Sequence, residues 1–313
     1  MLRYYITEKS RILQISEPLP GSWIRLTDPT EAEAQQVAGT LGIDLDDILA
    51  ATDLDENNRV ELADGYTLII IDIPAEEVRH GKEVYNTIPM GIMLTGDHIV
   101  TVTIQQTPVL QAFADGRYRG FSTKKRMRFI YQIMLENTLR FQDGLRDIDR
   151  KRRLIEEDIG SRTGEDDLIG LHELESTLVY FATGLSGNSN VLNRLTRYER
   201  IEQYPEDKDL LGDVIVENQQ AMEMTQIYQG IIDSTRDLMS TILDKRLNNV
   251  MKILTSITLI LAIPTVISGL YGMNVNGRGM PFAAMVNGFG IICLIILAIC
   301  AVLFFLLRRL RML

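Results

Sequence analysis

Hydroxyl-bearing side chains recur along one apolar stretch near the C-terminus of this 313-residue chain. They are Thr255, Ser256, Thr258, Thr265 and Ser268. Lys252 and Arg278 bound the stretch, and no charged residue lies between them. If an aqueous path crosses a membrane here, this stretch should line it. The alternative is that each hydroxyl donates a hydrogen bond to a carbonyl of its own helix, as Ser and Thr often do.

A second uncharged stretch, almost wholly apolar, lies between Arg278 and Arg308. Each stretch exceeds the roughly 20 apolar residues that cross a bilayer as a helix. The sequence therefore predicts a membrane hairpin, with helices at 250–273 and 283–307 and an outward loop at 274–282. One hairpin cannot enclose water, because polar faces cannot point at lipid. Several chains must therefore assemble, with the first helix lining the path and the second facing lipid.

Charge is divided unevenly along the chain. The whole sequence has 32 Lys and Arg against 42 Asp and Glu, a net charge of −10. After position 249 there are five basic residues and no acidic one, so the first 249 residues carry −15 and the remainder +5. An acidic soluble part repels nucleic acid and suits a surface that concentrates cations. An ordinary acidic surface explains the same charge equally well.

Basic residues flank the predicted hairpin on one side. Lys245, Arg246 and Lys252 precede the uncharged part of the first span, and the basic tail 308–313 follows the second. By the positive-inside rule, both termini are expected in the cytoplasm of a cell (inner) membrane, with the loop outside. Arg278 in the loop opposes this orientation. Residues Met1–Tyr5 contain no apolar core, so no signal peptide is expected.

The remaining segments must position the hairpin. Residues 1–121 mix strand-like runs with short helical patterns and predict an α+β cytoplasmic domain. Residues 122–205 predict an antiparallel helical pair, although Gly184 and Gly187 should weaken the second helix. Residues 206–249 predict a cytoplasmic stalk that continues into the first span as one helix, about 100 Å long at 1.5 Å per residue. Such a helix could transmit movement to the membrane, or could be a static stalk.

The finer pattern of residues 1–121 indicates individual elements. Turns at residues 63–65 and 95–97 indicate hairpin connections. Residues 28–30 resemble a helix start, and Asp44 should cap a short helix that carries Asp46 and Asp47. The expected strands are Leu2–Thr7, Trp23–Leu26, Tyr66–Ile73, Thr87–Leu94 and His98–Thr103.

Two residue pairs on the predicted long helix share one spacing. Asp237 and Asn248 are eleven residues apart, about three turns, so they lie on one face. Leu254 and Thr265 repeat that spacing. Singly, Asp237 is an ordinary surface charge and Leu254 an ordinary packing residue. Each spacing places its two residues on one face of the helix.

The turn between the spans carries Tyr271-Gly272-Met273-Asn274, followed by Met280-Pro281. At the end of the first of two C-terminal spans, this sequence resembles the signature of the CorA family of divalent-cation channels. The resemblance covers the whole chain in layout and is residue-specific from about Asp213 to Pro281. It implies a homopentamer in the lipid bilayer that passes hydrated Mg²⁺ into the cytoplasm, and not an enzyme.

The resemblance also implies roles for individual residues. Amide oxygens of Asn274 and carbonyls near Gly272 would hydrogen-bond the water shell that Mg²⁺ gives up reluctantly. Gly272 is expected to let the backbone turn as the helix ends. The implied selectivity filter is Gly272, Met273 and Asn274, and the implied pore-lining residues are Asp237, Asn248, Leu254 and Thr265.

Regulation by Mg²⁺ is a further implication of the resemblance. Residues 45–49 and 212–214 match segments whose acidic residues bind Mg²⁺ between subunits and hold the channel closed. Asp47 and Asp213 of neighbouring subunits are therefore expected metal ligands, beside Asn274 at the filter. The alternatives are a capping-region charge for Asp47 and an exposed helix charge for Asp213.

The loop departs from the family pattern, because Phe282 follows Met280-Pro281 where many members carry Glu, and Arg278 adds a cation. Ion identity therefore stays open among Mg²⁺, Co²⁺, Ni²⁺ and Zn²⁺, with a zinc or cobalt/nickel transporter as the alternative. A membrane-anchored scaffold or sensor is an alternative of another class. No nucleophile–base pair or metal-ligand spacing indicates an enzyme.

Overall fold

The structure is a computed structural model, and it describes residues 1–9, 11–79, 81–118, 120–158, 165–199, 204–274, 280–282, 285–310 and 312. The chain divides into two compact units, 1–236 and 237–313. The boundary falls inside helix α6 (Pro205–Tyr271), which therefore contributes residues to both units.

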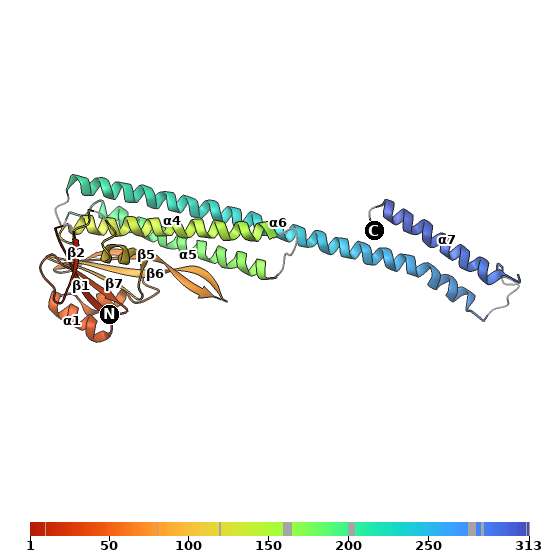
Figure 1. The fold of residues 1–313 in the computed structure, drawn as a ribbon, viewed down its shortest axis with the longest axis horizontal. Helices are drawn as coiled ribbons and strands as arrows, with labels where there is room; N and C mark the ends of the chain where they lie inside the picture. The colour runs from red at the N-terminus through yellow and green to blue at the C-terminus, as the bar shows by residue number, and fades with distance from the viewer. Residues whose placement is uncertain are drawn as a thin grey trace. The chain divides into compact units, whose positions relative to one another are not determined.

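Within the described residues, the first unit is built on a mixed sheet of seven strands in the order β2-β1-β3-β7-β6-β5-β4 (Figure 1). Neighbouring strands are antiparallel, except that β3 and β7 are parallel. The strands are β1 (Leu2–Glu8), β2 (Arg11–Ile15), β3 (Trp23–Thr27), β4 (Arg59–Leu62), β5 (Tyr66–Arg79), β6 (Lys82–Thr95) and β7 (Ile99–Thr103). The five predicted strands are confirmed, whereas β2 and β4 were missed.

The two missed strands lie at the two edges of the sheet. Their side chains are exposed or half-buried throughout, so they lack the apolar alternation of a half-buried strand. The β5–β6 hairpin is also longer than predicted. Its register runs from Tyr66 opposite Thr95 to Arg79 opposite Lys82, and its outer half is largely polar and more exposed.

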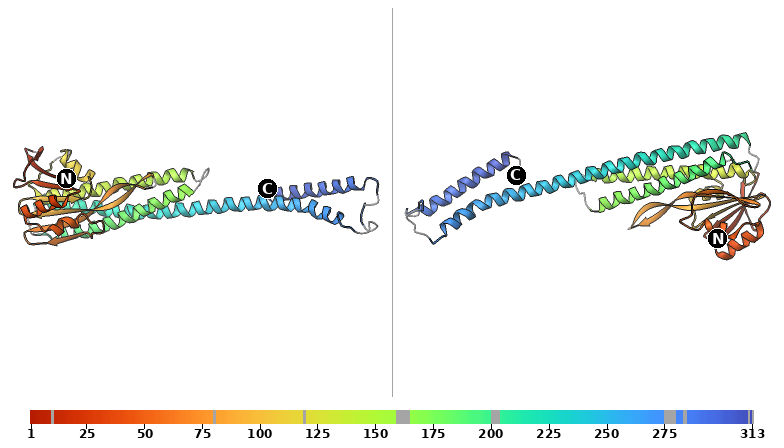
Figure 2. Two further views of the ribbon diagram at one scale, coloured as in Figure 1. Left: turned by 90° about the horizontal axis from the view of Figure 1, so that it is seen from below. Right: turned by 180° about the vertical axis from the view of Figure 1, so that it is seen from behind.

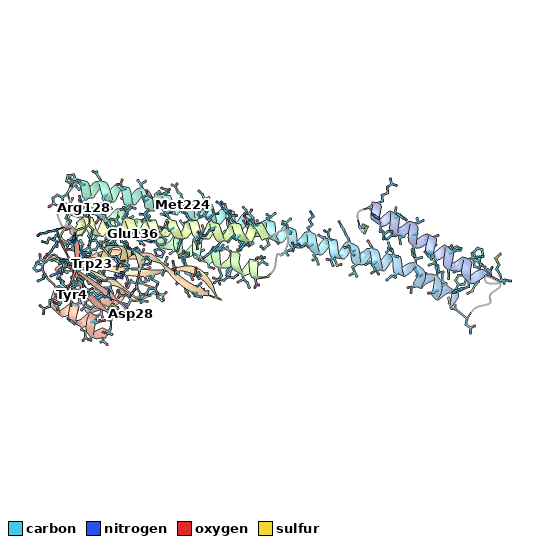
Figure 3. All side chains as sticks on the ribbon, in the orientation of Figure 1. Tyr4, Trp23, Asp28, Arg128, Glu136 and Met224 are labelled. Atoms are coloured by element: carbon cyan, nitrogen blue, oxygen red, sulfur yellow. The ribbon has the colours of Figure 1, made fainter. Side chains whose placement is uncertain are left out.

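One face of the sheet packs on α3 (Pro108–Ala114) and α4 (Arg126–Asp158) around a buried aromatic cluster. Trp23, which is labelled in Figure 3, is fully buried at its centre. Its ring stacks on Tyr5 at 5.0 Å and meets Phe129 edge-on at 5.2 Å. Its indole N–H donates to Thr101 Oγ1 at 2.9 Å, so the one polar atom of the ring is satisfied.

The opposite face is covered by α1 (Glu31–Leu41) and α2 (Leu45–Ala50), which enclose a second apolar cluster. Both helix starts agree with the prediction. Thr30 caps α1 in a reciprocal capping box with Glu33, and Asp44 caps α2 by accepting the Asp46 N–H. Strand β5 serves both clusters, because successive side chains of a strand point to opposite faces.

Helices α4, α5 (Glu165–Leu195) and the first part of α6 lie side by side in the first unit (Figures 1 and 2). Polar side chains link them. Asn218 on α6 donates to the Leu185 carbonyl on α5 at 3.1 Å. At the start of α4, Arg128, which is labelled in Figure 3, forms an ion pair of 2.6 Å with Asp207 at the start of α6.

The two glycines in α5 serve close packing and do not interrupt the helix. A Cβ on Gly187 would lie 2.5 Å from Asn58 Nδ2, and one on Gly184 would lie 3.1 Å from Asp72 Cβ. Asn188, between them and the sheet, accepts the Asp72 N–H at 2.9 Å and donates to its carbonyl at 2.8 Å. This amide pairs with the edge of β5 beyond the end of β4, where the Asp72 carbonyl also accepts a hydrogen bond of 2.8 Å from the Asn137 amide. The helix is continuous through both glycines, and the expectation that they weaken it stays a prediction.

The second unit comprises α6 from Asp237 onward and α7 (Gly288–Arg309). Among the described helices, these are the ones long and apolar enough to cross a membrane. Two contacts join them: Ser256 Oγ donates to the Met312 carbonyl at 3.3 Å, and Cys300 Sγ lies 3.8 Å from the Ile260 carbonyl oxygen. The structure thus has the predicted C-terminal helical hairpin.

Candidate ion pathway and regulatory site

Helix α6 ends at the motif that the sequence singled out. The Gly272 N–H donates to the Ser268 carbonyl at 2.9 Å, and Met273 and Asn274 follow with exposed side chains. The backbone leaves α6 at Gly272, as expected, and it does so without a positive φ. Its lack of a side chain matters for packing instead, because a Cβ there would lie 3.2 Å from the Ser268 oxygen.

The segment after the loop is tied back to α6. The Tyr271 hydroxyl donates to the Pro281 carbonyl at 2.8 Å. Phe282 has φ +61°, which is uncommon for a bulky residue, and a Cβ on Gly288 would clash with its carbonyl oxygen. The departure from the family pattern at Phe282 therefore lies at a tight turn. Arg278 lies outside the described residues.

The predicted pore-lining positions form one arc on α6. At 3.6 residues per turn, Asp237, Asn248, Leu254 and Thr265 fall within about 120° of one another. They are not in a single line, because the second pair is offset from the first by about 100°. Met251, three residues from both Asn248 and Leu254, lies at the middle of the arc and is 52% exposed. Met251 was not among the predicted arc residues, although its spacing of three residues from Asn248 and from Leu254 places it on the same side of the helix.

Helix α7 covers the opposite side of α6. Ser256 and Ile260, which contact residues after and within α7, lie about 140° and 180° from the middle of the arc. Ser256 is fully buried, so its hydroxyl serves packing and not a path. The arc residues are exposed in the single chain, with Leu254 at 56%. The hairpin thus leaves Asn248, Met251 and Leu254 for something outside the chain, whereas Thr265 lines a hollow shared with α7.

Three of the other hydroxyls, those of Thr258, Thr265 and Ser268, bond within their own helix. Thr258 Oγ1 donates to the Leu254 carbonyl at 2.8 Å, and Thr265 Oγ1 donates to the Leu261 carbonyl at 2.9 Å. This does not remove them from a path. A hydrated cation directs water hydrogens outward, and a hydroxyl whose own hydrogen is engaged still offers oxygen lone pairs as acceptors.

In the first unit, Asp47 is the third residue of α2 and is half-buried. Its carboxylate accepts a hydrogen bond from the Tyr66 hydroxyl, which in turn accepts the Asp44 N–H at 3.2 Å. Burial, followed by the hydrogen bond to Asp47, raises the pKa of Tyr66 to about 12, so the phenol stays protonated and donates. Sequence reasoning missed Tyr66, because it reads as an ordinary strand residue after a turn.

Asp213 is exposed on α6. The described residues contain no group of three or more His, Cys, Asp or Glu side chains placed to hold a metal ion. A cation bound by Asp47 and Asp213 must therefore take further ligands from water or from another chain.

A hydroxyl–imidazole pair is present, but it does not form an enzyme site. Ser22 Oγ lies 3.0 Å from His98 Nδ1. Ser22 is fully buried, so a substrate cannot reach its hydroxyl. Burial lowers the pKa of His98, which keeps the ring neutral.

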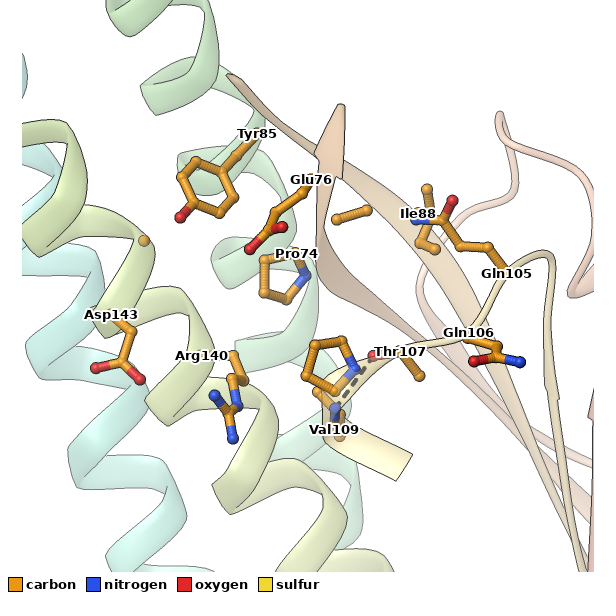
Figure 4. A pocket seen from close by; sticks show the side chains of 13 residues that line it. Pro74, Glu76, Tyr85, Ile88, Gln105, Gln106, Thr107, Val109, Arg140 and Asp143 are labelled. Carbon is orange, nitrogen blue, oxygen red and sulfur yellow. Dashed lines mark hydrogen bonds between the residues drawn. The ribbon is translucent and has the colours of Figure 1, made fainter. Parts of the chain in front are cut away.

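A cleft of about 370 Å³ lies between β5, β6, the segment before α3, and α4 (Figure 4). Two of the charged side chains that line it are engaged: Arg140 bonds Glu136 at 2.7 Å, and Asp143 bonds Arg146 at 2.8 Å. A third, Glu76, is exposed. Neither Arg140 nor Asp143 is therefore an unpaired charged group that a ligand in the cleft could bind.

The chain was compared with known protein families and structures. The sequence model of the CorA-like Mg²⁺ transporter protein family matches residues 21–309. The chain belongs to this family. The prediction of a divalent-cation transporter is thereby confirmed at the level of the family, whose members are transporters.

Relatives agree in sequence and fold. The cobalt/magnesium transport protein CorA of Methanocaldococcus jannaschii is 26% identical over 296 residues, covering 92% of this chain and 90% of that protein. The complete structure of the CorA magnesium transporter from that organism matches with a TM-score of 0.84 at 23% identity, covering 99% and 98% of the two chains. The cytoplasmic domain of ZntB from Vibrio parahaemolyticus matches with a TM-score of 0.59 at 11% identity, covering 78% and 98%. The predicted fold class is confirmed.

Proposed function

We propose that this protein is a homo-oligomeric channel, with five subunits as the family resemblance implies, that passes hydrated Mg²⁺ into the cytoplasm. The observation that carries the proposal is the division of α6 into two faces. Its contacts to α7 and Met312 lie on one side, and the exposed arc of Asn248, Met251 and Leu254 lies on the other. Several copies with their arcs turned inward would enclose the path that one hairpin cannot.

The filter acts on the hydrated ion. Mg²⁺ dehydrates reluctantly, so a ring of Asn274 amide oxygens would accept hydrogen bonds from its water shell. The Thr258 and Thr265 oxygens would continue these acceptors along the path. No further energy source is required: a membrane potential supplies about 2.3 kcal/mol per charge per 100 mV, and roughly double that for a divalent ion.

The closed state would be held at the inner half of the arc. Leu254 and Met251 are bulky, uncharged and exposed in the single chain. A ring of such side chains blocks ions by expelling water. Asp237 and Asn248 precede this constriction on the cytoplasmic side, where a carboxylate ring would attract cations.

Cytoplasmic Mg²⁺ would also regulate the channel through Asp47 and Asp213 of neighbouring subunits. Carboxylate oxygens are the ligands that Mg²⁺ prefers, and both side chains are at least partly accessible. Unbridged, the two charges repel each other and oppose the closed assembly. A cation that binds only the closed state stabilises it by RT ln(1 + [L]/Kd), about 2.7 kcal/mol at hundredfold excess.

The location follows from the charge distribution. The proposal places both termini in the cytoplasm and the hairpin in the cell (inner) membrane, with the Asn274 turn outside. Co²⁺ is the second candidate ion, because the relative from Methanocaldococcus jannaschii is described as a cobalt/magnesium transport protein.

Asn274→Ala tests the filter. The variant should abolish divalent-cation uptake into proteoliposomes while the oligomer stays intact on size-exclusion chromatography. Asn287→Ala is the matched control: Asn287 is also exposed, precedes α7, and makes no capping hydrogen bond. Normal uptake by an intact Asn274→Ala oligomer would reject Asn274 as the filter residue.

A further inference from the structure

We propose that Tyr66 is a positioning residue for Mg²⁺ sensing, and that its hydroxyl holds the Asp47 carboxylate toward the neighbouring subunit. The proposal rests on the proposed function of Asp47 as a ligand of the regulatory cation. It adds to the acidic ligands a neutral residue, Tyr66, whose hydroxyl affects the affinity of the sensor for Mg²⁺.

The two short helices of the first unit begin differently. In α1 the capping box is closed directly, because Glu33 Oε2 accepts the Thr30 N–H at 3.0 Å and Thr30 Oγ1 accepts the Glu33 N–H at 3.3 Å. Glu33 Oε2 also forms an ion pair of 2.9 Å with the Met1 amine, so it is held by the helix terminus and by the start of the chain. The acidic residue at its third position is a structural group.

In α2 the Tyr66 hydroxyl lies between the two groups that would otherwise close the capping box, the Asp44 N–H and the Asp47 carboxylate. Asp47 occupies the same third position as Glu33, yet the N-cap N–H of Asp44 donates to Tyr66 Oη at 3.2 Å. The Tyr66 hydroxyl then donates to Asp47 Oδ2. The Asp47 carboxylate therefore does not bond the Asp44 N–H directly but is linked to it through the Tyr66 hydroxyl.

The Tyr66 side chain is held firmly by packing, so its hydroxyl can fix the position of the Asp47 carboxylate. Its side chain is 6% exposed and belongs to the apolar cluster under α1 and α2, with Leu68 and Ile70 of the same strand. The hydroxyl occupies Oδ2, so the geometry leaves Oδ1 of Asp47 as the atom to offer to a cation. Mg²⁺ requires near-octahedral geometry, so it binds more tightly when its ligands are already held in position.

Loss of the hydroxyl should release Asp47. The carboxylate would then either turn back to the free Asp44 N–H, which closes the box as in α1, or sample several rotamers. Both outcomes remove a pre-ordered ligand, so the Mg²⁺ concentration that closes the channel should rise. The expected shift is about threefold to tenfold, the size of one hydrogen bond.

Tyr66→Phe in the full-length oligomer tests this, with the Mg²⁺ midpoint of protease protection as the readout. Tyr198→Phe is the matched control, because the Tyr198 hydroxyl is also buried but lies 2.8 Å from Thr67 Oγ1 and not from Asp47. Tyr66→Phe should raise the midpoint and Tyr198→Phe should not. In an Asp47→Asn background, Tyr66→Phe should add no further shift.

The outcomes separate this proposal from the proposed function. A midpoint unchanged by Tyr66→Phe but raised by Asp47→Asn overturns the role of Tyr66 and leaves the sensor standing. A midpoint unchanged by Asp47→Asn overturns the sensor at Asp47, and the role of Tyr66 with it. Equal shifts in Tyr66→Phe and Tyr198→Phe, or an undiminished shift in the Asp47→Asn background, reveal general loosening of the sheet and also overturn the proposal.

Discussion

The two units of this chain use their apolar residues in different ways. In the first unit, Trp23, Phe129 and their neighbours are fully buried by other parts of the same chain. In the second, Met251, Leu254 and most of α7 are exposed in the single chain. The first unit therefore has its own core, whereas the second needs lipid and further copies. Substitutions in the core of the first unit should change stability, and substitutions on the exposed arc of the second should change transport.

Trp23→Ala should have the largest effect on stability. Trp23 is fully buried between Tyr5 and Phe129, so truncation leaves a cavity and an unpaired Thr101 hydroxyl. The expected loss is about 3–5 kcal/mol in the free energy of unfolding of the first unit. Thermal unfolding followed by circular dichroism should show a much lower midpoint for this unit. A loss near zero would contradict the burial of Trp23 between Tyr5 and Phe129.

Asp72→Asn should stabilise the first unit at neutral pH. Burial raises the pKa of Asp72 to about 6, although the Asn58 amide opposes the rise. Since an unfolded Asp titrates near 3.9, the protonated form contributes stability that is complete below about pH 4 and is lost as pH rises through 6. The variant should therefore gain about 2–3 kcal/mol on the wild type between pH 4 and pH 7. Parallel stability curves over that range would contradict the burial of Asp72.

Gly187→Ala should destabilise the contact between α5 and the sheet. Its Cβ would lie 2.5 Å from Asn58 Nδ2, so Asn58 must move and its bond of 2.9 Å to Asn188 is lost. The expected cost is about 1–3 kcal/mol. Gly39→Ala in α1 is the matched control, because no atom lies within 4 Å of its Cβ, and it should stabilise by about 0.5–1 kcal/mol. A stabilising Gly187→Ala would show that α5 does not approach the sheet this closely.

Leu254→Gly should leave the unfolding of the first unit unchanged and raise leak through the channel severalfold at closing Mg²⁺ concentrations. Ile257→Gly is the control, because Ile257 is also exposed on α6 but lies about 120° from the middle of the arc. Vesicle leak assays compare the two variants. Equal leak would place the constriction elsewhere on the helix.

Much of the first unit could be predicted from sequence because its pattern is local. The buried strands alternate or run apolar, and Asp44 caps a helix within three residues of itself. Edge strands β2 and β4 escaped because no buried face marks them. The packing roles of Gly184 and Gly187 escaped for a different reason: their partners, Asp72 and Asn58, are more than 100 residues away in sequence.

The same limit applies to the candidate sites. The spacing of Asp237, Asn248, Leu254 and Thr265 places them on one side of a helix, and that much is visible in the sequence. Which side is free depends on where α7 packs, and Ser256 reveals this only through its contact with Met312. Tyr66 could not be singled out, because its hydroxyl meets Asp47 through the tertiary fold of a strand against a helix.

Ion flux into proteoliposomes, with Mg²⁺, Co²⁺, Ni²⁺ and Zn²⁺ compared side by side, tests the central claim most directly. The purified oligomer should admit Mg²⁺, with Co²⁺ as the second ion, and Asn274→Ala should admit none of the four. An intact wild-type oligomer that passes no divalent cation would contradict the channel and favour a membrane-anchored scaffold. Flux of Zn²⁺ without Mg²⁺ would contradict the assignment of the ion.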